Sequence, residues 1–185
     1  NTGNGHSPLR VIGHENVQRR FDRYRSTEAW NILINARQFG GVRDDLGMTN
    51  DLRPAGGGQR LPFFLPPDTA DVSDVVGDFS SMTFGGETIE FHHGKGETDD
   101  HLWSWFPDKK WVATGDFVIW NFPNAGNPQK VQRWPIEWAQ TLRRIAAKGP
   151  ELLLPAHGLP IAGKERIARV LIEIATALEN RVRDV

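Results

Sequence analysis

Three residues that can bind a metal ion or a proton lie just after predicted strands. Glu97 follows a strand that is expected to end at His93. Asp116 and His157 each follow a further predicted strand. Strand ends hold side chains with little positional freedom, so residues from separate strands can converge at one edge of a sheet. One His and two carboxylates can bind a divalent ion, which lowers the pKa of a bound water molecule. The spacing therefore makes a metal site one hypothesis for these residues.

The same residues also have ordinary structural interpretations. Asp is common in turns, so Asp116 after Gly115 can simply cap a turn. A single His such as His157 is more often a hydrogen-bonded loop residue than a ligand. Glu97 and Asp99 can be solvated residues of the polar loop GETDDH (96–101). By spacing alone, both interpretations stay open.

The other histidines are expected to have structural roles. His92 and His93 are adjacent in a strand, so they face opposite sides and cannot both point into one site. Ordinary packing is the favoured interpretation for both. His14 has no ligand partner close in sequence and is treated as structural or surface-exposed. His101 begins a strand and can point either way.

The composition limits the kinds of partner and of metal site. The chain has 22 basic and 23 acidic residues, which gives no reason to expect a nucleic-acid or membrane-surface partner. It has no long apolar run, so no membrane span is expected, and a soluble cytoplasmic or periplasmic location is predicted without a choice between the two. Because the chain has no Cys, a metal must be held by His, Asp and Glu, which suits zinc, manganese or iron.

Hydrophobic patterns predict one mixed α/β domain over residues 1–185. Residues 1–70 are expected to form a short strand at 9–12, helix from 15 to 38 with a possible break at 26–27, and a long loop. Residues 71–185 are expected to contain two strand hairpins, a helix, a short strand and an amphipathic C-terminal helix: 80–84 with 88–92, 102–106 with 111–114, 135–148, 151–154 and 164–183.

Three segments carry a family resemblance: GETDDHLWSWFPDKKWVATGD (96–116), NFPNAGNPQKVQRWP (121–135) and LLLPAHGLPIAG (152–163). They resemble the second half of metallo-beta-lactamase-fold hydrolases, and most closely the alkylsulfatase-like branch. Most of that superfamily has G-H-T in the first segment, with His on the first metal. Here Glu97 takes that place, as a Glu does in alkylsulfatases. Asp116 matches the acidic residue that bridges two metals, and His157 matches the last His, on the second metal.

The resemblance implies a four-layer αββα sandwich, represented here mainly by its second half. It also implies two metal ions, with zinc expected and manganese or iron as alternatives, held in part by Glu97, Asp116 and His157. The implied activity is hydrolysis of an alkyl sulfate ester by a metal-activated water molecule. The substrate-binding residues implied by this resemblance are Asn124, Lys130 and Arg133, in the loop after the bridging Asp.

The sequence departs from the family pattern in one respect. The metal motif His-x-His-x-Asp-His is expected upstream of residue 1, and no such string occurs in the chain. We therefore expect weak metal binding and no activity from this chain alone. The expected partner is the missing N-terminal half or a second copy, together with a small-molecule ester as substrate. Two alternatives remain: a glyoxalase-like thioesterase or lactonase, and a truncated domain without catalysis.

Overall fold

The structure is a computed structural model of the chain, and it describes residues 10–38, 72–125 and 133–185. The chain divides into two compact units. One unit contains residues 1–16 and 73–185, and the other contains residues 17–72. The predicted long loop at 40–67 lies outside the described residues.

Two helices, α1 (Asn16–Ser26) and α2 (Glu28–Gln38), account for the described part of the smaller unit. Thr27 separates them and belongs to neither. Its hydroxyl donates to the Arg23 carbonyl at 2.8 Å, and it accepts from the Asn31 side chain at 2.8 Å. The two helices are separated at Thr27, where the sequence predicted a possible break, so that prediction is confirmed.

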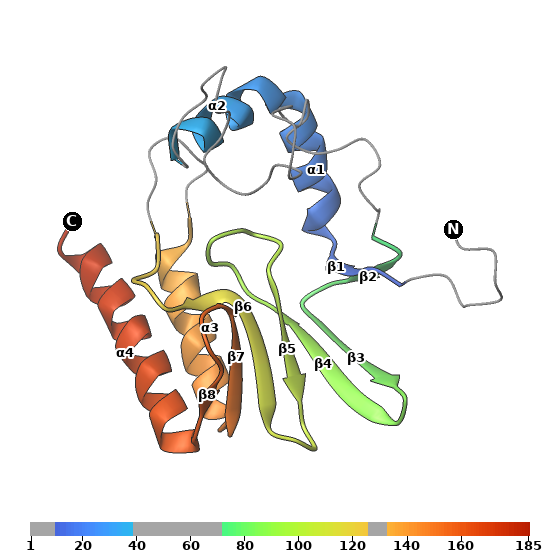
Figure 1. The fold of residues 1–185 in the computed structure, drawn as a ribbon, viewed down its shortest axis with the longest axis vertical. Helices are drawn as coiled ribbons and strands as arrows, with labels where there is room; N and C mark the ends of the chain where they lie inside the picture. Colours follow the sequence, from blue (N-terminus) through green and yellow to red (C-terminus); the bar gives the residue numbers. More distant parts are fainter. Residues whose placement is uncertain (1–9, 39–71, 126–132) are drawn as a thin grey trace, which may run out of the picture. The chain divides into compact units, whose positions relative to one another are not determined.

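The larger unit contains a six-stranded sheet with the order β3-β4-β5-β6-β7-β8 (Figure 1). Its strands are β3 (Phe79–Phe84), β4 (Glu87–His93), β5 (Leu102–Phe106), β6 (Trp111–Ile119), β7 (Leu152–His157) and β8 (Ile161–Ala162). All neighbours are antiparallel except β6 and β7, which are parallel. The two predicted hairpins are confirmed, the first turning at Gly85 and Gly86 with φ of +57° and +86°.

Two strands run further than the sequence predicted. β6 was expected to stop at Thr114 but continues to Ile119, and β7 was expected to stop at Leu154 but continues to His157. The pairing of β6 with β7 shifts register on both sides of Gly115, so a bulge interrupts the ladder without ending the strand. Gly115 and Pro155 were interpreted as the points where the strands end. Pairing between β6 and β7 instead continues beyond both residues.

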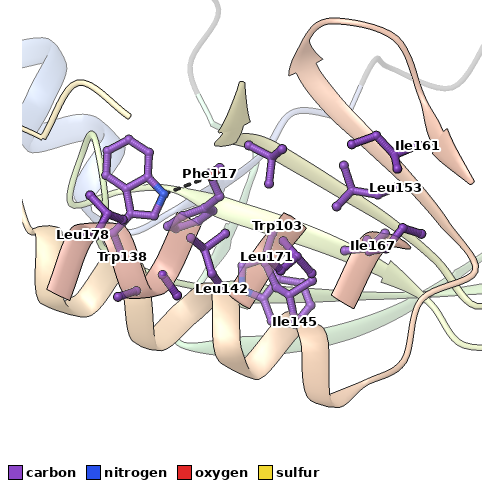
Figure 2. Close-up of a cluster of buried hydrophobic side chains, with 14 of the residues drawn as sticks. Trp103, Phe117, Trp138, Leu142, Ile145, Leu153, Ile161, Ile167, Leu171 and Leu178 are labelled. Carbon is purple, nitrogen blue, oxygen red and sulfur yellow. Dashed lines mark hydrogen bonds between the residues drawn. The ribbon is translucent and has the colours of Figure 1, made fainter. Parts of the chain in front are cut away.

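Helices α3 (Pro135–Ala147) and α4 (Lys164–Arg183) pack against one face of this sheet, as Figure 2 shows. The core between the two layers contains buried aromatic and aliphatic side chains from strands and helices: Trp103, Trp105, Val112, Phe117, Val118, Leu153, Trp138, Leu142, Ile145, Ile167, Leu171 and Leu178. The predicted helix boundaries agree with the structure to within one residue. The chain is a mixed α/β protein, as predicted, and in the described part of this unit a layer of two helices covers the six-stranded sheet.

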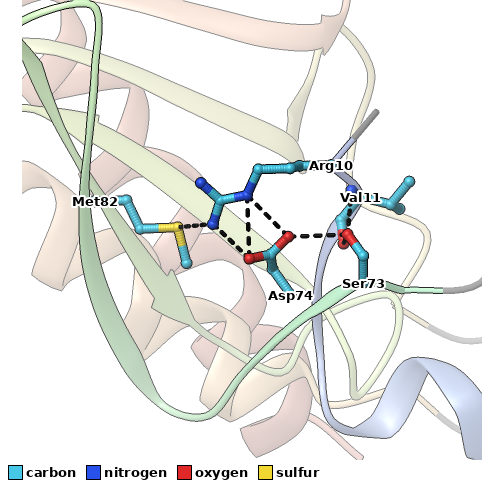
Figure 3. A network of polar contacts seen from close by, with 5 residues as sticks. All are labelled: Arg10, Val11, Ser73, Asp74 and Met82. Atoms are coloured by element: carbon cyan, nitrogen blue, oxygen red, sulfur yellow. Dashed lines mark hydrogen bonds and ion pairs between the residues drawn. The ribbon is translucent and has the colours of Figure 1, made fainter. Parts of the chain in front are cut away.

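A short parallel sheet joins β1 (Ile12–His14) to β2 (Asp74–Val76). The predicted strand at 9–12 is therefore displaced, because pairing with β2 selects residues 12–14 instead. Next to this sheet, the Arg10 guanidinium is ion-paired with the Asp74 carboxylate and donates to Met82 Sδ at 3.7 Å (Figure 3). Arg10 thereby connects the short sheet to β3. No described helix is long and apolar enough to cross a membrane.

Candidate functional site

Asp116 and His157 lie together on the neighbouring parallel strands β6 and β7. His157 is paired in register with Ile119, and its Nε2 lies 3.4 Å from Asp116 Oδ1. The His157 side chain is 74% exposed and the Asp116 side chain 37% exposed, so both donor atoms are open to solvent. A carboxylate oxygen and an imidazole nitrogen at this separation can bind one divalent ion.

Gly115 directs Asp116 away from the regular ladder. Its φ of +54° is a left-handed conformation, and the register shift on both sides of it marks the bulge. A Cβ atom at this position would lie 2.3 Å from His101 Nε2, a contact that no side chain can make without displacement. Only glycine fits both the conformation and the close approach of His101.

Gly115→Ala is therefore expected to lower the free energy of unfolding by about 2 kcal/mol or more, through backbone strain plus the clash with His101. Gly86→Ala is the matched control, because Gly86 also has positive φ (+86°) but no atom within 4 Å of the added Cβ. Urea unfolding followed by circular dichroism measures both. Equal losses for the two variants would show that the His101 contact contributes nothing.

The loop that carries Glu97 is anchored beside β6. Gly96 N–H donates to the Thr98 carbonyl at 3.1 Å, and the Gly96 carbonyl accepts from Trp134 N–H at 3.1 Å. A Cβ atom on Gly96 would lie 2.7 Å from the Phe117 ring, so the loop backbone lies directly on the residue after Asp116. The structure therefore places the backbone of the Glu97 loop next to the strand that carries Asp116.

The Glu97 carboxylate is ion-paired with Arg133. Arg133 is 6% exposed, and its guanidinium also donates to the Asn124 carbonyl oxygen. A buried guanidinium needs a paired anion, and Glu97 supplies it. The Asn124 residue itself is exposed. Of the three predicted substrate-binding residues, two thus meet at the Glu97 loop, whereas Lys130 lies outside the described residues.

His101 belongs to this site, although the sequence left its orientation open. Its ring stacks on Phe117 with centroids 4.1 Å apart. Burial lowers the pKa of His101, and the nearby Asp116 charge opposes that shift only in part. The imidazole is therefore neutral at neutral pH and acts as a packed support beside Gly115. The predicted hairpin of 102–106 with 111–114 brings His101 near Gly115, but the close approach of the ring also depends on the bulge at Gly115, which the sequence analysis did not predict.

Within the described ranges, one group of three possible metal ligands has all its ligand atoms within 4.8 Å of one another, and it consists of His14, Asp78 and His93. Glu97, Asp116 and His157 do not form such a group.

Comparison with known proteins identifies the family of the chain. Residues 29–157 match the family model described as the metallo-beta-lactamase superfamily. That stretch covers most of the chain. The chain belongs to the metallo-beta-lactamase superfamily. Members of this superfamily are hydrolases whose fold binds divalent metal ions, and the solvent-open oxygen and nitrogen donors of Asp116 and His157 fit such an ion.

The proteins that the chain resembles include alkylsulfatases. The chain is 25% identical over 101 residues to the linear primary-alkylsulfatase of Pseudomonas sp. (strain ATCC 19151), a match that covers 54% of this chain and 19% of that protein. The solved sec-alkylsulfatase Pisa1 from Pseudomonas sp. has a TM-score of 0.54 at 18% identity, covering 62% of this chain and 19% of that one.

The structure of a double mutant of that sec-alkyl sulfatase aligns with a larger part of this chain. Its TM-score is 0.68 at 16% identity, covering 92% of this chain and 28% of that one. At these identities the structural likeness shows the fold alone. The chain spans between about a fifth and three tenths of the length of these relatives.

Proposed function

We propose that this chain supplies one part of the active site of a metal-dependent hydrolase that releases sulfate from alkyl sulfate esters. The observation that carries the proposal is the Asp116–His157 pair, with donor atoms 3.4 Å apart on adjacent parallel strands and open to solvent. The Glu97 loop lies beside the same strand. The similarity to a linear primary-alkylsulfatase supports the choice of substrate class.

In this proposal Asp116, His157 and Glu97 hold the metal ions, with zinc as the expected metal and Asp116 as the bridging ligand. Metal ions held by these residues would lower the pKa of a bound water molecule and so provide a nucleophile at neutral pH. The chain's own residues position these ligands. Gly115 and the neutral His101 set the direction of the Asp116 side chain, and Gly96 fixes the start of the Glu97 loop against Phe117.

Arg133 has two successive roles in this proposal. In the chain as described, its guanidinium neutralises the Glu97 carboxylate. If Glu97 held a metal ion, its carboxylate charge would be neutralised there, and the Arg133 guanidinium would become available for a sulfate oxygen. A planar guanidinium matches the oxygens of a sulfate group well. Asn124 and Lys130 are proposed to complete the substrate-binding side.

The Glu97–Arg133 ion pair also favours a second candidate, a domain that keeps the superfamily fold without catalysis. In such a domain the buried Arg133 permanently replaces the metal as partner of Glu97. A thioesterase or lactonase of the same fold is a further alternative for the substrate. A Glu rather than His at position 97 counts against that alternative, because the resembling enzymes of that kind carry His there.

The test is release of inorganic sulfate from a medium-chain alkyl sulfate by the full-length protein that carries this sequence, loaded with zinc. Sulfate release that stops with a chelator and in Glu97→Gln supports the proposal. Cleavage of a thioester or lactone alone would replace the proposed substrate class. A metal-loaded protein that cleaves none of these, nor a phosphoester, would establish the domain without catalysis.

A further inference from the structure

We propose that His14, Asp78 and His93 form a second divalent-metal site, which joins the short β1–β2 sheet to the six-stranded sheet. We call these three residues the His14 cluster. They differ from the residues of the proposed active site, and this site goes beyond the proposed function. One ligand atom from each residue lies within 4.8 Å of the other two.

The hydrogen bonds of His93 leave a place for a cation. Its Nε2 lies 2.9 Å from the Asp99 carbonyl oxygen, which can only accept, so Nε2 carries the proton. In the neutral ring Nδ1 then has a lone pair, and it lies 3.2 Å from Asp78 Oδ1. An ionised carboxylate is also purely an acceptor. Two acceptors at this distance require a proton or a metal ion between them.

The Asp99 carbonyl provides the support that metal-binding histidines usually have. A histidine ligand commonly donates its other ring N–H to a carboxylate or a backbone carbonyl, which fixes its tautomer and orientation. The Asp99 carbonyl accepts from His93 and also from the Asn16 side-chain amide, in each case at 2.9 Å. The backbone N–H of His93 in turn donates to the Asp78 carbonyl at 2.9 Å. Two of the three ligands are thus held in place by backbone contacts.

His14 supplies the third donor. It is 4% exposed, and its ring stacks on His93 with centroids 3.8 Å apart and planes 10° from parallel. Burial and the neighbouring His93 lower the pKa of His14, so its ring is neutral and keeps a lone pair. That lone pair, on Nδ1, accepts from Asn16 N–H at 3.2 Å, which is at the long end for a hydrogen bond. An imidazole binds a metal ion in the plane of its ring, so metal binding would turn the His14 ring out of the stack and exchange this long contact for a bond to the ion.

The ligand set indicates which ions fit. Two imidazoles and one carboxylate suit zinc and related borderline ions, with a water molecule completing the coordination. Asp78 is 96% exposed, so an ion reaches the cluster directly from solvent. His14 ends β1, Asp78 lies between β2 and β3, and His93 ends β4. A metal here therefore has a structural role. It connects the C-terminal end of β1 to the six-stranded sheet, whereas Arg10, just before β1, already makes contacts at the N-terminal end.

The test uses the whole 185-residue chain, stripped with a chelator and titrated with Zn²⁺ by calorimetry and with Co²⁺ by visible absorption. We expect the affinity for Zn²⁺ to fall at least about 10-fold in Asp78→Asn. Loss of a residue that only supports a metal ligand already lowers metal affinity by about that factor, and Asp78 is proposed as a ligand itself. Asp78 is almost fully exposed, so this variant is expected to fold. Asp108→Asn, an exposed carboxylate in the β5–β6 turn, is the matched control.

Two further measurements separate this site from the proposed active site. Asp116→Asn is expected to leave the Asp78-dependent binding unchanged. Nitrogen NMR of the imidazoles is expected to show His93 Nδ1 shifting with Zn²⁺ while Nε2 keeps its proton. Binding that is lost in Asp116→Asn but kept in Asp78→Asn would overturn the site. So would a His93 ring that holds protons on both nitrogens at saturating Zn²⁺, because the cation between His93 and Asp78 is then a proton.

Discussion

Replacing Trp138 by Ala is expected to lower the free energy of unfolding by about 3–5 kcal/mol. Trp138 is fully buried in α3, and its indole N–H donates to the Phe117 carbonyl oxygen at 3.0 Å, the contact drawn as a dashed line in Figure 2. A Cβ atom on Gly96 would lie 3.2 Å from the Trp138 ring. The indole thus supports both the strand that carries Asp116 and the loop that carries Glu97.

Two variants separate the causes of this loss. Trp138→Phe keeps most of the apolar volume but leaves the buried Phe117 carbonyl without its indole donor, so a smaller loss of about 1–3 kcal/mol is expected. Trp120→Ala is the control, because Trp120 is 57% exposed and removal of its ring creates no enclosed cavity. Urea unfolding followed by circular dichroism ranks the three variants. If Trp138→Ala lost no more stability than Trp120→Ala, the indole would not be a central support.

The parts of the fold that were predictable from sequence are those determined by local pattern. The stripe of apolar residues in 164–183 predicted α4, and Pro135 with Gly149 predicted where α3 begins and ends. The pair Gly85-Gly86 predicted the first hairpin, since both glycines adopt positive φ in the turn. Each of these signals lies inside the element that it specifies, so no distant contact was needed to interpret it.

The features that were missed depend on contacts between distant segments. Asp116 was expected after a strand but lies within β6, because the parallel partner β7 continues the ladder past the bulge at Gly115. The stacking of His14 on His93 was not predicted, although both residues have the structural and packing roles that the sequence indicated. The Glu97–Arg133 pair was also missed, since Arg133 was considered only as a ligand for substrate. The periodic pattern of apolar residues within a segment does not indicate contacts between distant segments.

In the candidate site, too, some features were predictable from the sequence and others were not. Residue types and family resemblance identified Glu97, Asp116 and His157 as possible ligands, and the structure brings Asp116 and His157 to 3.4 Å. Their roles as metal ligands remain predictions. The supports of that pair, His101 and the close approach at Gly115, became visible only in three dimensions. The chemistry of a site can thus be anticipated from side-chain types, whereas the packing that orients it depends on the completed fold.

Asp116→Asn is expected to have the largest effect on metal binding and on sulfate release. The carboxylate is the proposed bridge between two ions, so its loss weakens both, whereas an amide of the same shape leaves the fold intact. In the full-length protein we expect metal affinity to fall by at least about 100-fold, since changes to residues that only support a ligand already cost about 10–100-fold. Calorimetric zinc titration measures the affinity, and sulfate release is expected to fall in parallel.

The half-exposed position of Asp116 makes this test informative, because its substitution creates no cavity and leaves no buried partner unpaired. Asp108→Asn controls for the loss of one negative charge on the same sheet, and Asp78→Asn controls for loss of a ligand at the His14 cluster. If Asp116→Asn bound zinc as tightly as Asp108→Asn and released sulfate at the same rate, Asp116 would not bridge the ions. The Asp116–His157 contact would then be an ordinary polar contact between β6 and β7, and the proposed active site would lose the observation that carries it.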